Sequence, residues 1–149
     1  MNIHIKPFSN LTVAELYAVL RLRSEVFMFE QQCFYQDLDN QDQHAEHILL
    51  MHPDTDTLVA YARTFAPNPQ NPHARIDRVI VAAEFRSQQI ARQLMKIAIQ
   101  HLCQQYGDNL IIDISAQSYL CQFYQSLGFE IRSPEYMEVG IPHCDMRLT

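Results

Sequence analysis

The middle of the chain holds the pattern that most restricts its fold: a β-branched segment, a short polar turn and a long amphipathic helix. Arg75–Val81 is rich in Ile and Val, which favours a strand. Apolar side chains then recur at helical spacing through Gln88–Tyr106, and Gly107 is placed to end that helix. Leu110–Ser115 follows as a second short strand. A strand, a crossover helix and a second strand form a parallel unit, so we expect an α/β fold with a mixed sheet.

The segments on either side of this unit add further strands and helices. The other expected strands are Asn2–Phe8, His47–Met51, Thr57–Phe65, Phe129–Arg132 and Ile141–Leu148. Thr12 and Glu15 form a capping box at the start of one helix, and Ala116–Leu127 has the pattern of another. The first of these helices is expected to bury a face made of Val13, Leu16, Leu20 and Phe27. The expected order along the chain is therefore β-α-β-β-β-α-β-α-β-β.

Composition narrows the class of protein. A length of 149 residues, with 48% hydrophobic residues, fits one domain over residues 1–149 with a sizeable core. The net charge of -6 argues against nucleic acid as a partner, because phosphate binding needs a basic face. No apolar run is long enough for a signal peptide or a membrane span, so we expect a cytoplasmic location and no membrane partner. The 4 cysteines form no CxxC pair, so we expect reduced thiols and no zinc site. The sequence leaves open whether the protein forms a homodimer.

The turn between the central strand and its helix, Arg86–Arg92, has the features of an anion site. The first N–H groups of a helix have no carbonyl partner within it, and the helix dipole favours negative charge there. Arg86 and Arg92 flank the turn and add positive charge, so a diphosphate would suit it. An ordinary strand-to-helix connection with surface arginines explains the same spacing, and both interpretations stay open on spacing alone.

Two segments of the chain together resemble the GNAT acetyltransferase superfamily. Arg86 and Ala91 match its cofactor motif, Arg/Gln-x-x-Gly-x-Gly/Ala, whereas Gln89 stands at the first glycine position and would tolerate a positive φ poorly. A later motif of the family is matched by Phe123, Tyr124, Gly128 and Phe129, with Gln117 at its asparagine position. Further stretches are similar to the ElaA-like branch of the superfamily, namely Leu16–Asp39, Leu58–Arg63, Arg78–Val81 and Gly140–Met146.

The resemblance implies a GNAT (acyl-CoA N-acyltransferase) fold, in which a mixed, mostly antiparallel sheet has two central parallel strands that splay apart, flanked by helices. It implies an N-acetyltransferase that uses acetyl-CoA as co-substrate without a metal. The acetyl group would move to a primary amine of a small molecule or peptide by direct attack in a ternary complex. The residues expected to bind acetyl-CoA are Val79, Ile80, Val81, Arg86, Ser87, Gln88, Gln89, Ile90, Ala91, Arg92, Gln117 and Tyr124.

The same resemblance leaves an alternative function open. A backbone N–H near Val79 or Ile80 is expected to polarise the thioester carbonyl, as an enzyme would require. However, Gln89 departs from the cofactor motif, and no general base is unambiguous in the sequence. The alternative is therefore a non-catalytic acyl-CoA-binding sensor, or a partner-binding protein, on the same fold.

Tyr124 is expected to be the general acid, since a phenol is protonated at neutral pH and can protonate a departing thiolate. Periodicity alone would make it a core aromatic. Candidate bases are Glu30, which follows an apolar run, His143, because histidine titrates near neutral pH, and Asp113 in an apolar strand. Each of the three has an alternative role: Glu30 as a surface charge at a helix end, His143 as a structural histidine, and Asp113 as a carboxylate that faces solvent. The acidic loop from Asp37 to Glu46 would steer a cationic amine toward the site.

Overall fold

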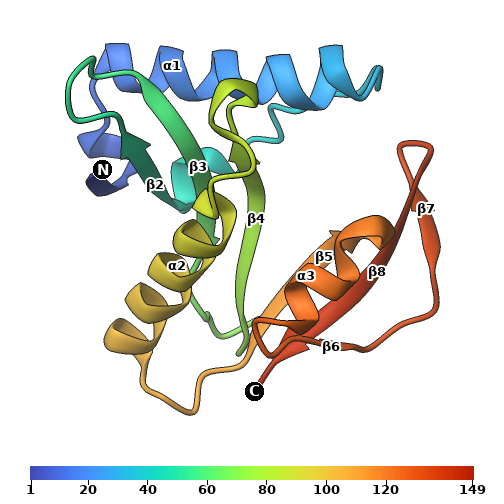
Figure 1. The fold of residues 1–149 in the computed structure, drawn as a ribbon. Helices are drawn as coiled ribbons and strands as arrows, with labels where there is room; N and C mark the ends of the chain where they lie inside the picture. The colour runs from blue at the N-terminus through green and yellow to red at the C-terminus, as the bar shows by residue number, and fades with distance from the viewer.

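Eight strands form one open, mixed sheet in the computed structural model, which describes residues 1–149 (Figure 1). The strands are β1 (Asn2–Pro7), β2 (Glu46–Met51), β3 (Leu58–Phe65), β4 (Ala74–Val81), β5 (Ile112–Gln117), β6 (Glu130–Ile131), β7 (Tyr136–Glu138) and β8 (Ile141–Leu148). They lie in the order β1-β2-β3-β4-β5-β8-β6, and β7 pairs with β8. Only β4 and β5 are parallel. The expected mixed, mostly antiparallel sheet is confirmed.

Helices cover both faces of this sheet. They are α1 (Val13–Ser24), a π-helical continuation of α1 (Glu25–Glu30), α2 (Ile90–Tyr106) and α3 (Cys121–Gln125). Alternate residues of a strand point to opposite faces, so Leu49 of β2 packs in the core cluster of α1, whereas Ile48 and Leu50 pack in the cluster of α2 and α3. The expected flanking helices are therefore confirmed. No helix in the structure combines the length and the apolar character needed to cross a membrane.

The parallel strands at the centre of the sheet separate along their length. β4 and β5 pair only over their first two residues, starting with Ala74 opposite Ile112. Both strands then continue without a ladder between them, and the ribbon shows them diverging (Figure 1). On its other side β5 stays paired with β8 as far as Gln117. The expected splayed strands are confirmed, and the wedge between them opens toward their C-terminal ends.

The start of α1 has the expected capping box. The hydroxyl of Thr12 accepts a hydrogen bond from the backbone N–H of Glu15 at 3.0 Å. The carboxylate of Glu15 accepts one in return from the backbone N–H of Thr12 at 2.8 Å. These reciprocal bonds satisfy donors that have no partner within the helix, which is why α1 begins at this point.

The buried face of α1 differs from the expected one. Val13 is 88% exposed, and the helix instead buries Val19, Leu22 and Arg23, followed by Val26 in the π-helical segment. The inner face carries an arginine, so the apolar periodicity of the sequence does not mark it. The aspartates that make this burial possible lie on a distant loop, described below.

Two details of the C-terminal half also differ from expectation. Backbone pairing with β8 keeps β5 extended as far as Gln117, so α3 begins at Cys121 and not at Ala116. The short strand β7 was not expected. Its connection to β8 places Val139 and Gly140 at positive φ values of 45° and 78°, as in a type I′ hairpin turn.

Candidate active site

A β-bulge interrupts β4 where that strand borders the wedge. In the ladder between β3 and β4, the single residue Ala62 lies opposite both Arg78 and Val79, and Arg78 has a positive φ of 51°. A bulge leaves backbone groups of the extra residue without a ladder partner and bends the strand. The N–H donor expected near Val79 or Ile80 therefore belongs to an irregular stretch of β4 with an open edge.

The loop after β4 has the left-handed backbone conformation that glycine adopts easily, although no glycine is present. Gln89, at the glycine position of the motif, has a φ of 62° and immediately precedes α2, and Ser87 has a φ of 67°. No side chain caps the start of α2, and its first turn carries no acidic residue. The first N–H groups of the helix are therefore free of side-chain competitors, and the helix dipole adds to their attraction for an anion.

We expect Gln89→Gly to stabilise the protein by about 1 kcal/mol, because a residue with a Cβ is strained at positive φ and glycine is not. Urea unfolding measures this difference. Gln88→Gly is the matched control: Gln88 has no positive φ, so glycine there only adds freedom to the unfolded chain and should lower stability. Equal changes in the two variants would contradict strain at Gln89.

The two arginines that flank this loop have partners in the structure. Arg86 donates to both carboxylate oxygens of Glu30, at 2.8 and 3.1 Å, and to the carbonyl of Val81 at 3.1 Å. The side chains of Arg86 and Glu30 are 42% and 40% exposed, and such surface ion pairs contribute little stability. A bound anion can therefore compete for Arg86. Both carboxylate oxygens of Glu30 are in turn occupied by hydrogen bonds from Arg86.

Arg92 ties the start of α2 to α3. Its guanidinium donates to the hydroxyl of Ser126 at 2.7 Å and lies 5.5 Å from the centre of the Phe123 ring. These contacts hold the arginine beside the helix that carries Tyr124. The structure therefore brings the expected loop residues, from Arg86 to Arg92, and the expected acid to the α2 and α3 side of the sheet.

Tyr124 lies on α3 within an aromatic cluster. Its ring makes edge contacts with Phe123 and Phe129, at centroid distances of 5.1 and 5.9 Å. Burial raises the pKa of Tyr124 to about 12, with smaller contributions from Tyr119 and Cys121. The hydroxyl of Tyr124 makes no hydrogen bond to another side chain and is not sealed from solvent. The phenol therefore keeps its proton and has it available for a ligand.

His143 lies on β8 directly opposite Gln117, at the C-terminal end of β5. Its Nδ1 lies 2.7 Å from the carbonyl oxygen of Ile141. Because a carbonyl can only accept, Nδ1 must carry the hydrogen, and Nε2 of the neutral ring is left as the proton acceptor. Nε2 lies 3.5 Å from a carboxylate oxygen of Glu138. His143 therefore lies level with the open end of the wedge, on the strand next to β5.

Asp113 is not placed to act as a base. It lies at the closed end of the wedge, where β4 and β5 are still paired. Arg147 and His73 contact its carboxylate at 2.7 and 2.8 Å. Burial would raise the pKa of Asp113, but the hydrogen bonds from Arg147 and His73 outweigh it and hold that pKa below its usual range. Its role is to bind neighbouring strands and loops together.

A network of buried charges, which we call the arginine network, fixes the acidic loop to the sheet. Its members are Arg23, Arg63, Arg78, Asp37, Asp39, Asp42 and Asp77. Arg23 donates to Asp37 at 2.8 Å and to Asp42 at 2.7 Å. Arg63 forms two-pronged pairs with Asp39 and Asp77 and also reaches Asp42. The side chains of Arg23 and Arg63 are both 0% exposed, so the pairing compensates their removal from water.

The aspartates of the acidic loop are paired with arginines, so they have little free charge with which to steer a cationic amine. The side chains of Asp37 and Asp42 are each 9% exposed, and that of Asp39 is 29% exposed. Hydrogen bonds from Arg63 hold the pKa of Asp39 well below its usual range, against the effect of burial. Burial would raise the pKa of Asp42, but bonds from Arg23 and Arg63 lower it overall. The charges of this loop hold the fold together.

His47 is a structural histidine. Its Nε2 lies 2.9 Å from the carbonyl of Asp42 and donates to it, while Nδ1 accepts from the hydroxyl of Tyr61 at 2.6 Å. Burial lowers the pKa of His47, so the ring is neutral and uses both nitrogens within the protein. No group of three or more His, Cys, Asp or Glu side chains in the structure is placed to hold a metal ion, and all four cysteines are free.

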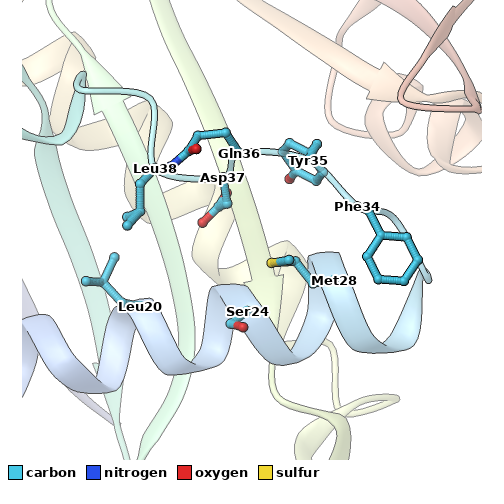
Figure 2. A pocket seen from close by; sticks show the side chains of 8 residues that line it. All are labelled: Leu20, Ser24, Met28, Phe34, Tyr35, Gln36, Asp37 and Leu38. Atoms are coloured by element: carbon cyan, nitrogen blue, oxygen red, sulfur yellow. The ribbon is translucent and has the colours of Figure 1, made fainter.

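The structure has a pocket that the sequence analysis did not predict. It has a volume of about 450 Å³ and lies between the C-terminal part of α1 and residues 34–38 (Figure 2). A local signal was present: Phe34, Tyr35 and Leu38 are apolar residues within an otherwise acidic loop. Phe34, one of the residues that line the pocket, is 94% exposed.

Comparisons with known proteins agree with this geometry. Residues 13–149 match the family described as acetyltransferase (GNAT) domain. The chain is 38% identical over 138 residues to protein ElaA of Escherichia coli strain K12, covering 93% of this chain and 90% of that protein. The crystal structure of Escherichia coli ElaA superimposes with a TM-score of 0.91 at 36% identity, covering 99% of both chains. A crystal structure of an acyl-CoA N-acyltransferase from Pseudomonas aeruginosa gives a TM-score of 0.92 at 32% identity and covers 100% of both.

Proposed function

Because the chain belongs to the GNAT acetyltransferase family, in its ElaA-like branch, we propose that it transfers an acetyl group from acetyl-CoA to a primary amine in a ternary complex. The observation that carries this proposal is the wedge between β4 and β5. The start of α2 has no side-chain cap, and the phenol of Tyr124 keeps its proton, so both would be open to a ligand bound in the wedge. An extended chain ending in a diphosphate fits such a site, and the coenzyme of this family has that shape.

The chain offers contacts along the whole length of such a ligand. The N–H groups from Ser87 to Ala91, together with Arg86 and Arg92, suit the diphosphate. The open edge of β4 at Val79 and Val81 suits the amides of the pantetheine arm, which would bond to it as an added strand does. Gln117 is the last residue of β5, next to the open end of the wedge. These residues would place the thioester beside the bulge.

The bulge and Tyr124 would have different roles in the reaction. Acetyl-CoA supplies an activated acetyl group as a thioester. A free N–H at the bulge would stabilise the oxygen of the tetrahedral intermediate, as oxyanion donors do. Tyr124 would then donate its proton to the departing sulfur, because its phenol remains protonated at neutral pH. Holding amine and thioester together would supply much of the remaining rate gain.

His143 is the base that the geometry favours over Glu30. Its Nε2 is the unprotonated nitrogen of the neutral ring, and Glu138 lies close enough to stabilise the charge that forms after proton uptake. Glu30 is engaged by Arg86 through both oxygens. It would become available only when an anion draws Arg86 away, so its role is secondary in this proposal.

Ligand-induced stabilisation and thiol release test the proposal together. We expect acetyl-CoA at about 100 times its Kd to add about 2.7 kcal/mol of stability, which raises Tm by roughly 5–10 °C for a chain of this size. Addition of a primary amine should then release free CoA thiol. Arg92→Ala should reduce the shift in Tm, because it removes a charge from the diphosphate site. Stabilisation without thiol release from any amine would favour the acyl-CoA sensor, and no stabilisation would reject the cofactor site.

A further inference from the structure

Two of the free cysteines meet where α3 packs on the sheet. The Sγ atoms of Cys121, the first residue of α3, and Cys144, on β8, lie 2.8 Å apart. A disulfide bond is about 2.05 Å long, so the two sulfurs are within about 1 Å of bonding distance. The thiol of Cys33 instead contacts backbone carbonyls at 3.5 Å, and Cys103 lies on α2. Cys121 and Cys144 are therefore the two cysteines placed to react with each other.

The sheet and the core hold both cysteines in place. Cys144 lies opposite Ala116 in the ladder between β5 and β8, and both residues belong to the core cluster of α2 and α3. Cys121 packs against the same cluster from the start of α3, which lies across β5 and β8 (Figure 1). Arg92 fixes the other end of α3 through the hydroxyl of Ser126. The two thiols therefore face each other across the interface between α3 and the sheet.

The two thiols differ in their exposure to solvent. Cys144 is buried, with 5% of its surface exposed, whereas Cys121 is partly exposed. Burial and the contact with Cys121 raise the pKa of Cys144 well above its usual range, so this thiol keeps its proton at neutral pH. It can donate that proton toward the sulfur of Cys121. A small reagent from solvent therefore reaches Cys121 first, with the second thiol already in contact behind it.

We propose that Cys121 and Cys144 form an oxidative modification site, at which a hydroperoxide converts the two thiols into a disulfide between α3 and β8. The sulfur of Cys121 attacks one peroxide oxygen, the O–O bond breaks, and a sulfenic acid forms while water or an alcohol leaves with the former thiol proton. The sulfur of Cys144 then attacks the sulfur of Cys121, the S–O bond breaks, and the oxygen leaves as water with the proton of Cys144. The two sulfurs together lose two electrons, which the peroxide gains. Because the sulfurs are in contact, the second step is intramolecular, which compensates for a thiol that holds its proton.

The bond would restrain the helix that carries Tyr124. Cys121 and Tyr124 are three residues apart, so they lie on the same side of α3. This helix has only 5 residues, and a covalent link at its first residue ties it to the ladder of β5 and β8. The link also joins positions 23 residues apart in the sequence, which lowers the entropy of the unfolded chain. The oxidised protein is therefore expected to be more stable, with a more rigid α3.

Peroxide treatment of the reduced protein, followed by mass spectrometry, tests the proposal. After digestion without reductant, we expect one disulfide-linked pair of peptides, which contains Cys121 and Cys144. Cys33 and Cys103 should still react with iodoacetamide, and dithiothreitol should reverse the link. Oxidation should raise Tm by roughly 5–10 °C, because it closes a loop of the unfolded chain. Amide hydrogen exchange in α3 should become slower, because local opening of the helix is restrained.

Single replacements separate the pair from the other thiols. Cys121→Ser and Cys144→Ala should each abolish both the link and the rise in Tm on oxidation, whereas Cys103→Ser is the matched control and should retain both. Oxidation of Cys121 without a link, a link to another cysteine or between two chains, or no reaction at all would overturn the site. A link without any rise in Tm or slowing of exchange would overturn the restraint on α3. None of these measurements uses acetyl-CoA, so they decide the matter whether or not acetyl transfer occurs.

Discussion

Replacing Tyr124 with Phe should lower kcat by about 10²–10⁴-fold, the usual contribution of a positioned general acid. The change removes one oxygen from a side chain whose hydroxyl has no partner within the protein, so the aromatic contacts with Phe123 and Phe129 are retained. The Kd for acetyl-CoA should therefore stay within about twofold, since a group that acts only in the transition state lowers kcat and kcat/KM equally and leaves ground-state binding unchanged. Steady-state thiol release and calorimetric binding measure the two quantities.

A neighbouring tyrosine provides the control. Tyr119 lies in the turn that leads into α3 and is 74% exposed, so Tyr119→Phe should leave kcat unchanged. The pH profile adds a second check. Because burial raises the pKa of Tyr124 to about 12, its phenol stays protonated throughout the accessible range, and the wild-type rate should show no alkaline fall below about pH 10 from this group. Wild-type turnover in Tyr124→Phe would remove the phenol from the mechanism.

Features set by neighbouring residues were predictable from the sequence. The capping box of Thr12 and Glu15 depends on a spacing of three residues, and the strand, turn and helix around residues 75–106 follow from local periodicity. The wedge between β4 and β5 came from the family resemblance, because no periodicity reveals where a ladder stops. Gln89 shows a different limit: its type argued against a positive φ, yet the loop adopts one.

Features built from distant charges were not predictable. Arg23 pairs with aspartates 14 and 19 residues away, and Arg78 with one 41 residues away. The spacing of residues in the sequence does not reveal such pairs. The buried face of α1 was therefore not recognised, because it contains Arg23, and the acidic loop was interpreted as a solvated surface. The candidate acid and the anion loop came from motifs and stay predictions, whereas the pairing of Glu30 with Arg86 and the pocket beside α1 required the folded chain.

Replacing Arg63 with Met should destabilise the fold by about 3–5 kcal/mol, the cost of leaving buried charges without their partner. Arg63 is completely buried, and its guanidinium accounts for five hydrogen bonds to Asp39, Asp42 and Asp77. Burial would lower the pKa of Arg63, but its bonds to Asp77 and Asp39 raise it overall, so the charge persists. Methionine fills part of the space and supplies none of these donors. Urea unfolding at neutral pH measures the loss.

Arg75→Met is the matched control, because Arg75 lies 3.7 Å from Asp77 but its side chain is 45% exposed. It should cost less than about 1 kcal/mol, as surface pairs do. The deficit of Arg63→Met should also shrink in acid. The folded-state pKa values of Asp39 and Asp42 are depressed, so the stability they contribute is present above their unfolded pKa, about 4, and is lost as pH falls. A loss in Arg63→Met no larger than in Arg75→Met, or one that does not change with pH, would mean that this network does not hold the acidic loop in place.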